Sequence, residues 1–323
     1  MKTLVKLVYL LRFQHSSCTE IHKLNDDVRP RVTLTNGLTV IGVNDYGYAD
    51  VGNMFDYFSG LNLGKNSSAQ PEAVQFYEDK GDFKPVQSFK GIHYGQAERF
   101  EKSKFWERPE NLLEQDCERS AAMCPQNMTR TDLWLHNLDY GDGWKNRSYT
   151  EDCLTLEVYG PIGEKNLPVF VYIHGGGYAT GSSQLDMNFL AASQNMVFVA
   201  IQYRLNILGN LALNSDDSWG NYGLFDQRLG LEWIKQEISL FGGNPEDIQI
   251  GGESAGGGSV SAQMHYEART NVEEHDPERT DKSKMLFHTS HALSGNLYNR
   301  WSIGYPWQVE VWVNMTHQYL TGA

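Results

Sequence analysis

Short stretches of alternating apolar and polar residues mark the first predicted element of the chain. Residues 31–43 alternate on both sides of Asn36-Gly37. Because Asn-Gly readily adopts the two positive φ values of a type I′ turn, the pattern predicts an N-terminal β-hairpin. Over about residues 44–88 the period is lost among Gly, Asn, Asp and Ser, with scattered aromatic residues. We interpret this stretch as an irregular insertion.

Beyond Cys153 short β-branched or aromatic runs alternate with helical stretches. This alternation is typical of an α/β fold with a mostly parallel sheet and helices on both of its faces. Apolar residues at helical spacing predict a helix over Asn221–Phe241, which ends at Gly242-Gly243. The predicted strands are Leu167–Tyr172, Met196–Tyr203, Asp247–Ile250 and one near Met285–Leu293.

The composition is that of one large globular domain, since 323 residues with 40% hydrophobic and 12% aromatic residues can bury a sizeable core. The formal net charge of −13 opposes binding to phosphate groups, so we expect no nucleic-acid partner. Beyond the N-terminus no uninterrupted apolar stretch approaches the roughly 18 residues that a membrane-spanning helix requires. We therefore predict no membrane segment in this chain.

The first 30 residues are interpreted as a leader that is either disordered or a weak signal segment. Their apolar run starts after a basic residue, but Lys6 interrupts it and Arg12 closes it. A signal peptide usually has a longer uninterrupted apolar region.

Sequons and cysteines indicate passage through the secretory pathway, so we expect a secreted or extracellular protein. Four Asn-x-Ser/Thr sequons make these residues candidates for glycosylation: Asn66, Asn127, Asn146 and Asn314. The cysteines have neither CxxC spacing nor a histidine cluster suited to zinc, which favours disulfides over a metal site. They are Cys18, Cys117, Cys124 and Cys153. We expect no metal and no cofactor.

A candidate nucleophile lies where a predicted strand turns directly into a helix. Residues 252–256, Gly-Glu-Ser-Ala-Gly, fit the pattern G-x-S-x-G. In so tight a turn, side chains at Gly252 and Gly256 would clash with neighbouring backbone, whereas Ser254 projects its hydroxyl above the sheet. A serine among glycines is more often an ordinary turn, so the pentapeptide needs support from its context.

That support comes from a glycine run at the end of the predicted strand Leu167–Tyr172. His174 is followed by Gly175, Gly176 and Gly177, which leave their backbone N–H groups unobstructed. Together with the N–H of Ala255, these donors can stabilise the oxyanion of a tetrahedral intermediate. A glycine run by itself could be only a flexible loop. The two motifs in this order, both at strand ends, favour a catalytic interpretation.

These motifs, and several others, resemble the type-B carboxylesterase and cholinesterase family, which has the α/β-hydrolase fold. The resemblance covers the chain from about residue 31 to its end, except for residues 44–88. By this resemblance, residues 31–323 form a partial carboxylesterase domain. The further matching segments are Phe89-Lys90-Gly91-Ile92, Glu151-Asp152-Cys153-Leu154, residues 220–227, and Phe241-Gly242-Gly243-Asn244-Pro245.

The resemblance implies roles for individual residues. Gly176 and Gly177 join Ala255 as oxyanion donors, and Glu253 is the acidic residue that tunes the site beside Ser254. Cys124 pairs with Cys153 in a disulfide, whereas Cys117 and Cys18 receive no assigned partners.

The family has the catalytic order Ser, then Glu or Asp, then His, and both partners lie far downstream of the serine. The resemblance therefore leads us to expect a truncated chain, in which both partners and the C-terminal strands fall beyond Ala323. Substitute bases and acids are disfavoured, because they fall in structural elements or in a polar loop. These residues are His174, His265, His288, His291, His317, Glu273, Glu274 and Asp276.

The sequence thus predicts a serine carboxylic-ester hydrolase for a small-molecule ester, impaired as this chain. Two alternatives stay open: a non-catalytic adhesion or receptor ectodomain with a protein partner, as in proteins resembling neuroligins and gliotactin, and a secreted decoy that binds ligand without turnover. The intact glycines and serine favour the enzyme, since a binding protein has no chemical reason to keep them.

Aromatic residues that could line a cation-binding gorge are Trp134, Tyr140 and Trp144.

Overall fold

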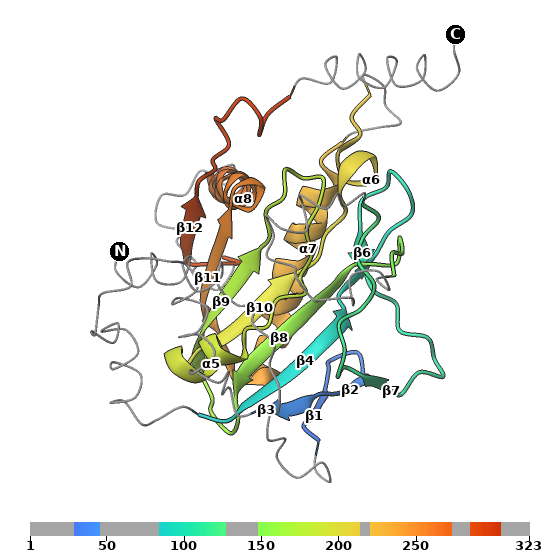
Figure 1. Cartoon of the computed structure of the whole chain (residues 1–323), viewed down its shortest axis with the longest axis vertical. Coiled ribbons are helices and arrows are strands. Elements are labelled where there is room, and N and C mark those ends of the chain that lie inside the picture. Colours follow the sequence, from blue (N-terminus) through green and yellow to red (C-terminus); the bar gives the residue numbers. More distant parts are fainter. Residues whose placement is uncertain (1–28, 46–83, 127–147, 214–219, 273–284, 305–323) are drawn as a thin grey trace, which may run out of the picture.

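The structure is a computed structural model that describes residues 29–45, 84–126, 148–213, 220–272 and 285–304. Its centre is a seven-stranded sheet with the order β12-β11-β9-β10-β8-β4-β3 (Figure 1). In chain order these strands are β3 (Val43–Asp45), β4 (Val86–His93), β8 (Thr155–Pro161), β9 (Leu167–Ile173), β10 (Val197–Ile201), β11 (Gly243–Glu253) and β12 (Thr289–Leu293). The four strands predicted after Cys153 are thus present as β9, β10, β11 and β12.

The sheet is mixed rather than mostly parallel. The pairings among β12, β11, β9 and β10 are parallel, whereas β10 with β8, β8 with β4, and β4 with β3 are antiparallel. Parallel neighbours need a crossover connection, usually a helix, and antiparallel neighbours do not. The parallel strands lie in the part of the chain after Cys153, where helical periodicity begins and can supply the crossovers. The parallel half is the part that carries the serine and glycine motifs.

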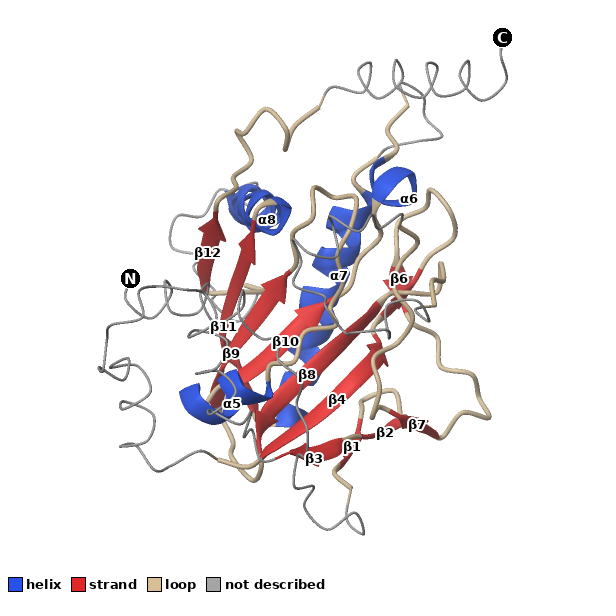
Figure 2. Ribbon diagram, in the orientation of Figure 1, coloured by secondary structure: helices blue, strands red, loops and turns tan. Residues whose placement is uncertain are grey.

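Alternate residues of the central strands point into two separate apolar cores. On β10, Val197, Val199 and Ile201 belong to a core that also contains residues of α7 (Tyr222–Glu237) and α8 (Ala255–Val272). Phe198 and Ala200 belong to the second core, which includes residues of α5 (Asn188–Gln194). In Figure 2, α5 lies in front of the strands and α7 behind them. The prediction of helices on both faces is confirmed.

The predicted helix over Asn221–Phe241 forms as α7, which continues into the 3₁₀ helix η2 (Ile238–Phe241). It ends at Gly242, whose φ is +88°. Glycine adopts this left-handed conformation without a steric penalty from a Cβ, which is why it commonly terminates helices. A short helix, α6 (Asn206–Asn210), precedes α7.

The predicted hairpin forms from β1 (Arg31–Thr33) and β2 (Thr39–Ile41), and β2 also pairs with β7 (Glu114–Asp116). Its turn is not type I′. Gly37 has a φ of +81°, but Asn36 is not among the residues with positive φ, and the Gly37 N–H donates to the Leu34 carbonyl at 2.9 Å. A three-residue loop with glycine in the left-handed position gives a hairpin of the same twist. A further small sheet contains β5 (Gly95–Gln96) and β6 (Lys104–Phe105).

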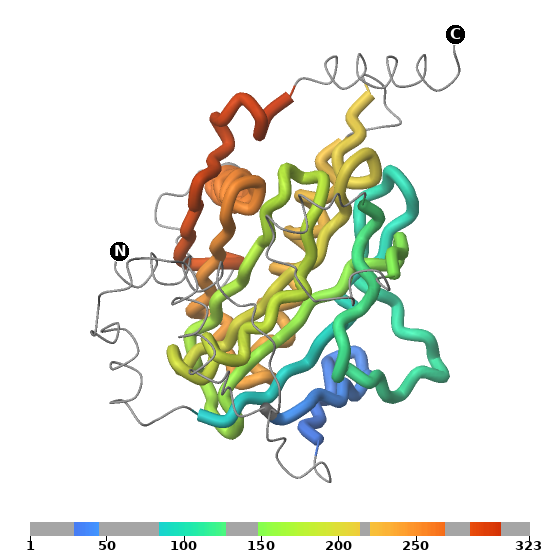
Figure 3. Tube along the Cα trace, viewed as in Figure 1, coloured from blue at the N-terminus to red at the C-terminus, as the bar shows by residue number. Residues whose placement is uncertain are grey.

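Figure 3 traces the chain from the blue hairpin near β4 to the red segment at the opposite edge of the large sheet, where β12 lies. The ends of the predicted irregular insertion are regular here, since residues 44–45 belong to β3 and residues 86–88 to β4. Several predictions fall outside the described residues: most of the leader, residues 46–83 of the insertion, Cys18, the three gorge aromatics and all four sequons. No helix within the described ranges is long and apolar enough to cross a membrane.

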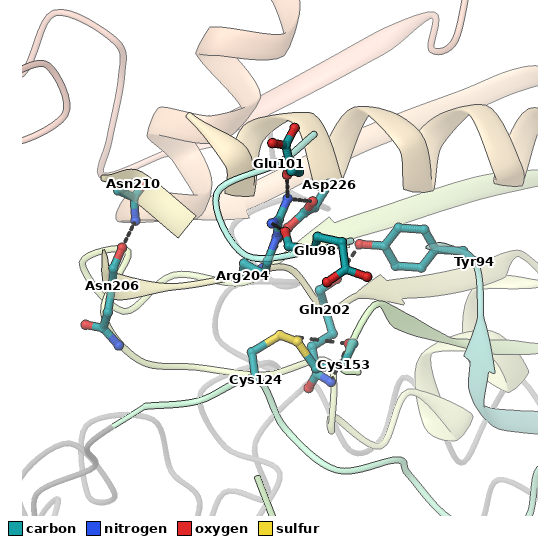
Figure 4. A network of polar contacts seen from close by, with 10 residues as sticks. All are labelled: Tyr94, Glu98, Glu101, Cys124, Cys153, Gln202, Arg204, Asn206, Asn210 and Asp226. Atoms are coloured by element: carbon teal, nitrogen blue, oxygen red, sulfur yellow. Dashed lines mark hydrogen bonds and ion pairs between the residues drawn. A yellow bond between two sulfur atoms is a disulfide. The ribbon is translucent and has the colours of Figure 1, made fainter. Parts of the chain in front are cut away.

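A buried ion pair connects the loop after β10 to α7 and to the segment after β5 (Figure 4). The side chains of Arg204 and Asp226 are 5% and 0% exposed, and two hydrogen bonds of 2.8 Å join them. Arg204 also donates to the carbonyls of Glu98 and Glu101, at 3.2 and 2.9 Å. All charged groups of the pair are therefore partnered, as burial requires.

We expect Asp226→Asn to lower the free energy of unfolding by about 3–5 kcal/mol, because it leaves the Arg204 guanidinium buried without its countercharge. Urea denaturation followed by circular dichroism measures this loss. Glu107→Gln is the matched control, since it breaks the exposed Lys104–Glu107 pair and should change stability little. Equal losses in the two variants would show that the buried Arg204–Asp226 pair is no more costly to break than an exposed pair.

Candidate active site

Ser254 lies in a strained turn between β11, which ends at Glu253, and α8, which begins at Ala255. Its φ is +58°, in the left-handed region that side chains other than glycine rarely adopt. The Ser254 N–H donates to the Leu293 carbonyl at 2.8 Å, and the Ser254 carbonyl accepts from the Gly258 N–H at 3.0 Å. Such strain persists only where the surroundings hold it, and it clusters at functional sites.

Glycines at both ends of this turn allow the close backbone contacts that hold it. A Cβ at Gly252 would lie 2.5 Å from the Gly256 carbonyl carbon and 2.6 Å from the Ile173 carbonyl oxygen. A Cβ at Gly256 would overlap the same Ile173 oxygen. Real Cβ atoms do not approach backbone so closely, so neither position accepts a side chain without movement of the chain.

The glycine run lies directly beside Ser254. β9 and β11 are parallel neighbours in which Ile173 pairs with Gly252, so both chains leave the sheet at the same edge. A Cβ at Gly175 would overlap the Glu253 carbonyl and lie 3.3 Å from the Ser254 Cβ. The two motifs, 80 positions apart in the chain, are thus brought into contact by the register of one strand pair.

The backbone of the run is folded into a left-handed turn. Gly176 and Gly177 have φ values of +111° and +63°, and the Gly176 carbonyl accepts from the N–H groups of Ala179 and Thr180, both at 3.0 Å. Within the described ranges, the N–H groups of Gly176, Gly177 and Ala255 donate no hydrogen bond. Unpaired N–H groups at a helix N-terminus and in such a turn can receive a developing negative charge.

Glu253, the acidic neighbour of the serine, is half-buried beside Tyr172 of β9. Burial raises the pKa of Tyr172 well above its usual value, and the negative charge of Glu253 raises it further. The Glu253 carboxyl therefore lies close enough to Tyr172 to act on it electrostatically.

Two aromatic residues that the sequence analysis did not single out lie at the same end of α8. The Tyr178 hydroxyl is 2.6 Å from the position that a Gly258 Cβ would take, and its ring centroid is 6.5 Å from that of Trp301. Burial raises the Tyr178 pKa, which the hydroxyls of Ser259 and Ser302 partly counter. The signal for Tyr178 was its place directly after the glycine run, whereas nothing local marks Trp301.

None of the described histidines is hydrogen-bonded to the Ser254 hydroxyl. His174 stacks on Tyr203 with ring centroids 4.3 Å apart, and its Nδ1 is 2.9 Å from the Gly175 carbonyl. His288 Nδ1 accepts from the Ile248 N–H at 3.2 Å, His265 is exposed on α8, and His291 lies near Phe170. The other candidate bases and acids, His317, Glu273, Glu274 and Asp276, lie outside the described residues.

The expected disulfide is present, since the Sγ atoms of Cys124 and Cys153 are 2.06 Å apart. Cys117 is buried with a free thiol, and burial raises its pKa to about 12, so the thiol is protonated and unreactive at neutral pH. Within the described part of the chain, no group of three or more His, Cys, Asp or Glu residues could hold a metal ion.

An open groove of about 610 Å³ lies away from the serine and does not include it. Its floor and walls include Trp106 and the ion pair of Arg99 with Glu151, whose Nε and Oε1 atoms are 2.8 Å apart. Since its charged lining residues are exposed, this groove does not provide the enclosed, preorganised environment that charge stabilisation requires. None of the residues that the sequence analysis predicted for catalysis lines this groove.

Comparison with known proteins supports the motif analysis. A family model described as the carboxylesterase family matches residues 75–318. Acetylcholinesterase 4 of Caenorhabditis briggsae is 32% identical over 235 residues, which are 70% of this chain and 36% of that protein. Pyrethroid hydrolase Ces2e of Rattus norvegicus is 46% identical over 147 residues, 44% of this chain and 26% of that protein. Cholinesterase of Mus musculus is 39% identical over 189 residues, covering 55% and 30%. The chain thus spans only about a quarter to a third of the length of these relatives.

We expect Gly252→Ala to lower the free energy of unfolding by at least about 3 kcal/mol, the upper end of the range for overpacking, because the new Cβ meets backbone on two sides. Chemical denaturation measures the loss.

Gly230→Ala on α7 is the matched control. Its Cβ would lie 3.1 Å from Ile201 Cγ2, a side-chain atom that can yield, and alanine gains up to about 1 kcal/mol of helix propensity. We expect a change near zero. If both variants lose the same stability, close backbone approach at Gly252 is not the constraint described here.

Proposed function

Because the chain belongs to the carboxylesterase family, an α/β-hydrolase family, we propose that it is a serine carboxylic-ester hydrolase that acts through an acyl-enzyme on a small-molecule ester. The observation that carries this proposal is the strained Ser254, with φ +58°, beside three N–H groups that donate to nothing in the described structure. A protein that only binds a partner needs neither the strain nor the free donors. The named esterase relatives are consistent with this choice.

In the first step the Ser254 hydroxyl oxygen attacks the ester carbonyl carbon while a base removes its proton. The carbonyl oxygen becomes an oxyanion, which the N–H groups of Gly176, Gly177 and Ala255 stabilise. Collapse of this intermediate expels the alcohol, which takes up the proton. Water then attacks the acyl-serine in the same manner, releases the carboxylic acid and restores the hydroxyl. Glu253 tunes the field at the turn.

This sequence of steps needs a base, and none of the described histidines is hydrogen-bonded to the Ser254 hydroxyl. We therefore propose that the 323-residue chain alone turns over esters poorly, because an unassisted serine hydroxyl is a weak nucleophile. We also propose that the protein is a secreted glycoprotein, since disulfides such as Cys124–Cys153 persist in oxidising compartments.

The test is the rate at which a fluorophosphonate probe labels the purified chain, with the labelled residue identified by mass spectrometry. We expect labelling at Ser254 that is at least about 10³-fold slower than for a reference esterase with an intact triad. The reason is that the proposed oxyanion donors lie beside Ser254, while no histidine of the described ranges is hydrogen-bonded to its hydroxyl.

Two variants separate the claims. Ser254→Ala should abolish labelling, whereas Ser294→Ala should not change it, although Ser294 also has a left-handed φ of +52°. Fast, stoichiometric labelling of Ser254 would overturn the impaired turnover. Labelling elsewhere, or none after long exposure, would overturn Ser254 as the nucleophile.

A further inference from the structure

A buried carboxyl group that the ester chemistry does not use lies on β8. This residue, Glu157, is only 1% exposed. It points toward the core that contains α5, because Tyr159, two positions along the strand, and Ala200, its partner on β10, both belong to that core. A buried carboxylate without a countercharge is costly, so its protonation state must be explained.

The number of donor protons around the Tyr159 hydroxyl indicates the protonation state of Glu157. The Tyr159 Oη is 2.5 Å from Glu157 Oε2 and 2.8 Å from the Leu185 carbonyl oxygen. A phenol has one proton, and a backbone carbonyl can only accept. If Glu157 is ionised, Tyr159 can donate to only one of the two oxygens. If Glu157 carries a proton, it donates to Tyr159, which donates to Leu185, and both contacts are hydrogen bonds.

The charged surroundings do not compel ionisation. The hydrogen bonds of Ser120 and Tyr159 favour the carboxylate, and so does Lys90, which lies in the bulge of β4 opposite Glu157. Asp186 opposes it. The Lys90 ammonium lies 5.9 Å from the centre of the Tyr159 ring. Burial dominates and raises the Glu157 pKa to about 7.

The acceptor at the far end of this chain of hydrogen bonds belongs to the segment that returns from the glycine run to the sheet. Residues 178–187 lead from Gly177 to the start of α5. Gln126 binds both backbone groups of Gly181, at 2.8 and 2.9 Å, and Gln184 donates to the Ala121 carbonyl at 2.8 Å. The Tyr159 to Leu185 bond is a further anchor, and it involves a group that can gain or lose a proton.

We propose that protonated Glu157, acting through Tyr159, is a latch that holds residues 183–187 against β8, and that loss of its proton weakens the latch. The latch does not depend on ester chemistry. Its consequence for catalysis is that the glycine run would be held less firmly when residues 178–187 are released. This consequence rests on the proposed function.

The direction of the pH dependence follows from the protonation states. The carboxyl binds its proton more tightly in this buried position than an ordinary glutamate does, whose pKa is 4.5. The latch therefore contributes fully below that value and is lost as the pH rises through about 7. Opening of the segment becomes easier with pH across this window.

Hydrogen exchange of the full chain, followed by mass spectrometry at pH 5 and pH 8 and corrected for intrinsic exchange rates, tests the proposal. We expect the protection of residues 183–190 to fall by about 10- to 100-fold from pH 5 to pH 8, as linkage to one carboxyl predicts. The protection of α7 serves as the internal reference. No step of this experiment uses esterase activity, so its failure is separate from failure of the proposed function.

Two variants sharpen the result. Glu157→Gln keeps the shape and donates permanently to Tyr159, so the segment should stay protected at both pH values. Tyr159→Phe removes the connection, so protection should be low at both. Equal protection of the wild type at both pH values, or a wild-type pH dependence in Glu157→Gln, would overturn the proposal. If a variant does not fold, carboxyl-carbon NMR of the ¹³C-labelled wild type provides the test. A Glu157 carboxyl that titrates with the ordinary glutamate pKa, near 4.5, would overturn the proposal.

Discussion

The close approach of two backbone segments is the constraint on which the rest of this structure depends. In the parallel pairing of β9 with β11, Ile173 faces Gly252, so both chains leave the sheet at the same edge. They can share that edge because Gly252 and Gly256 have no Cβ to collide with the Ile173 carbonyl. The juxtaposition of Ser254 and the glycine run therefore comes from the register of this strand pair. A shift of one residue would turn every side chain of the strand to the opposite face.

Two apolar cores on opposite faces of the sheet keep that register. Val199 and Ile201 pack toward α7 and α8, while Phe198 and Ala200 pack toward α5, so β10 and its neighbours are fixed from both sides. This rigidity is what allows Ser254 to keep a backbone conformation that costs about 1–3 kcal/mol. Polar anchors secure the connections: the Arg204 pair holds the loop after β10, and Gln126 holds the segment after the glycine run.

Local patterns predicted much of this arrangement, and contacts distant in the chain account for what they missed. The presence of the four strands after Cys153, the helix ending at Gly242, and the contact of the two glycine-rich motifs follow from the local sequence pattern and the order of strands and helices. The turn after Asn36 differed because two turn types suit the same Asn-Gly pair. The antiparallel half was missed because the residues before Cys153 show no helical periodicity that would place β4 and β8 in the sheet. Trp301 and Glu157 could not be assigned, since their partners come from other elements.

Glu157 and Ser254 illustrate how a sheet separates two electrostatic tasks. Ser254 lies at the N-terminus of α8, where the helix dipole and free N–H groups favour the negative charge that develops on an oxyanion. Additional anionic charge near this point would oppose that charge. Glu157 lies on the other face, toward α5, and its proton keeps it neutral below about pH 7. It can act on the glycine run only through the backbone of residues 178–187, because no charge of its own reaches the turn while that proton is bound.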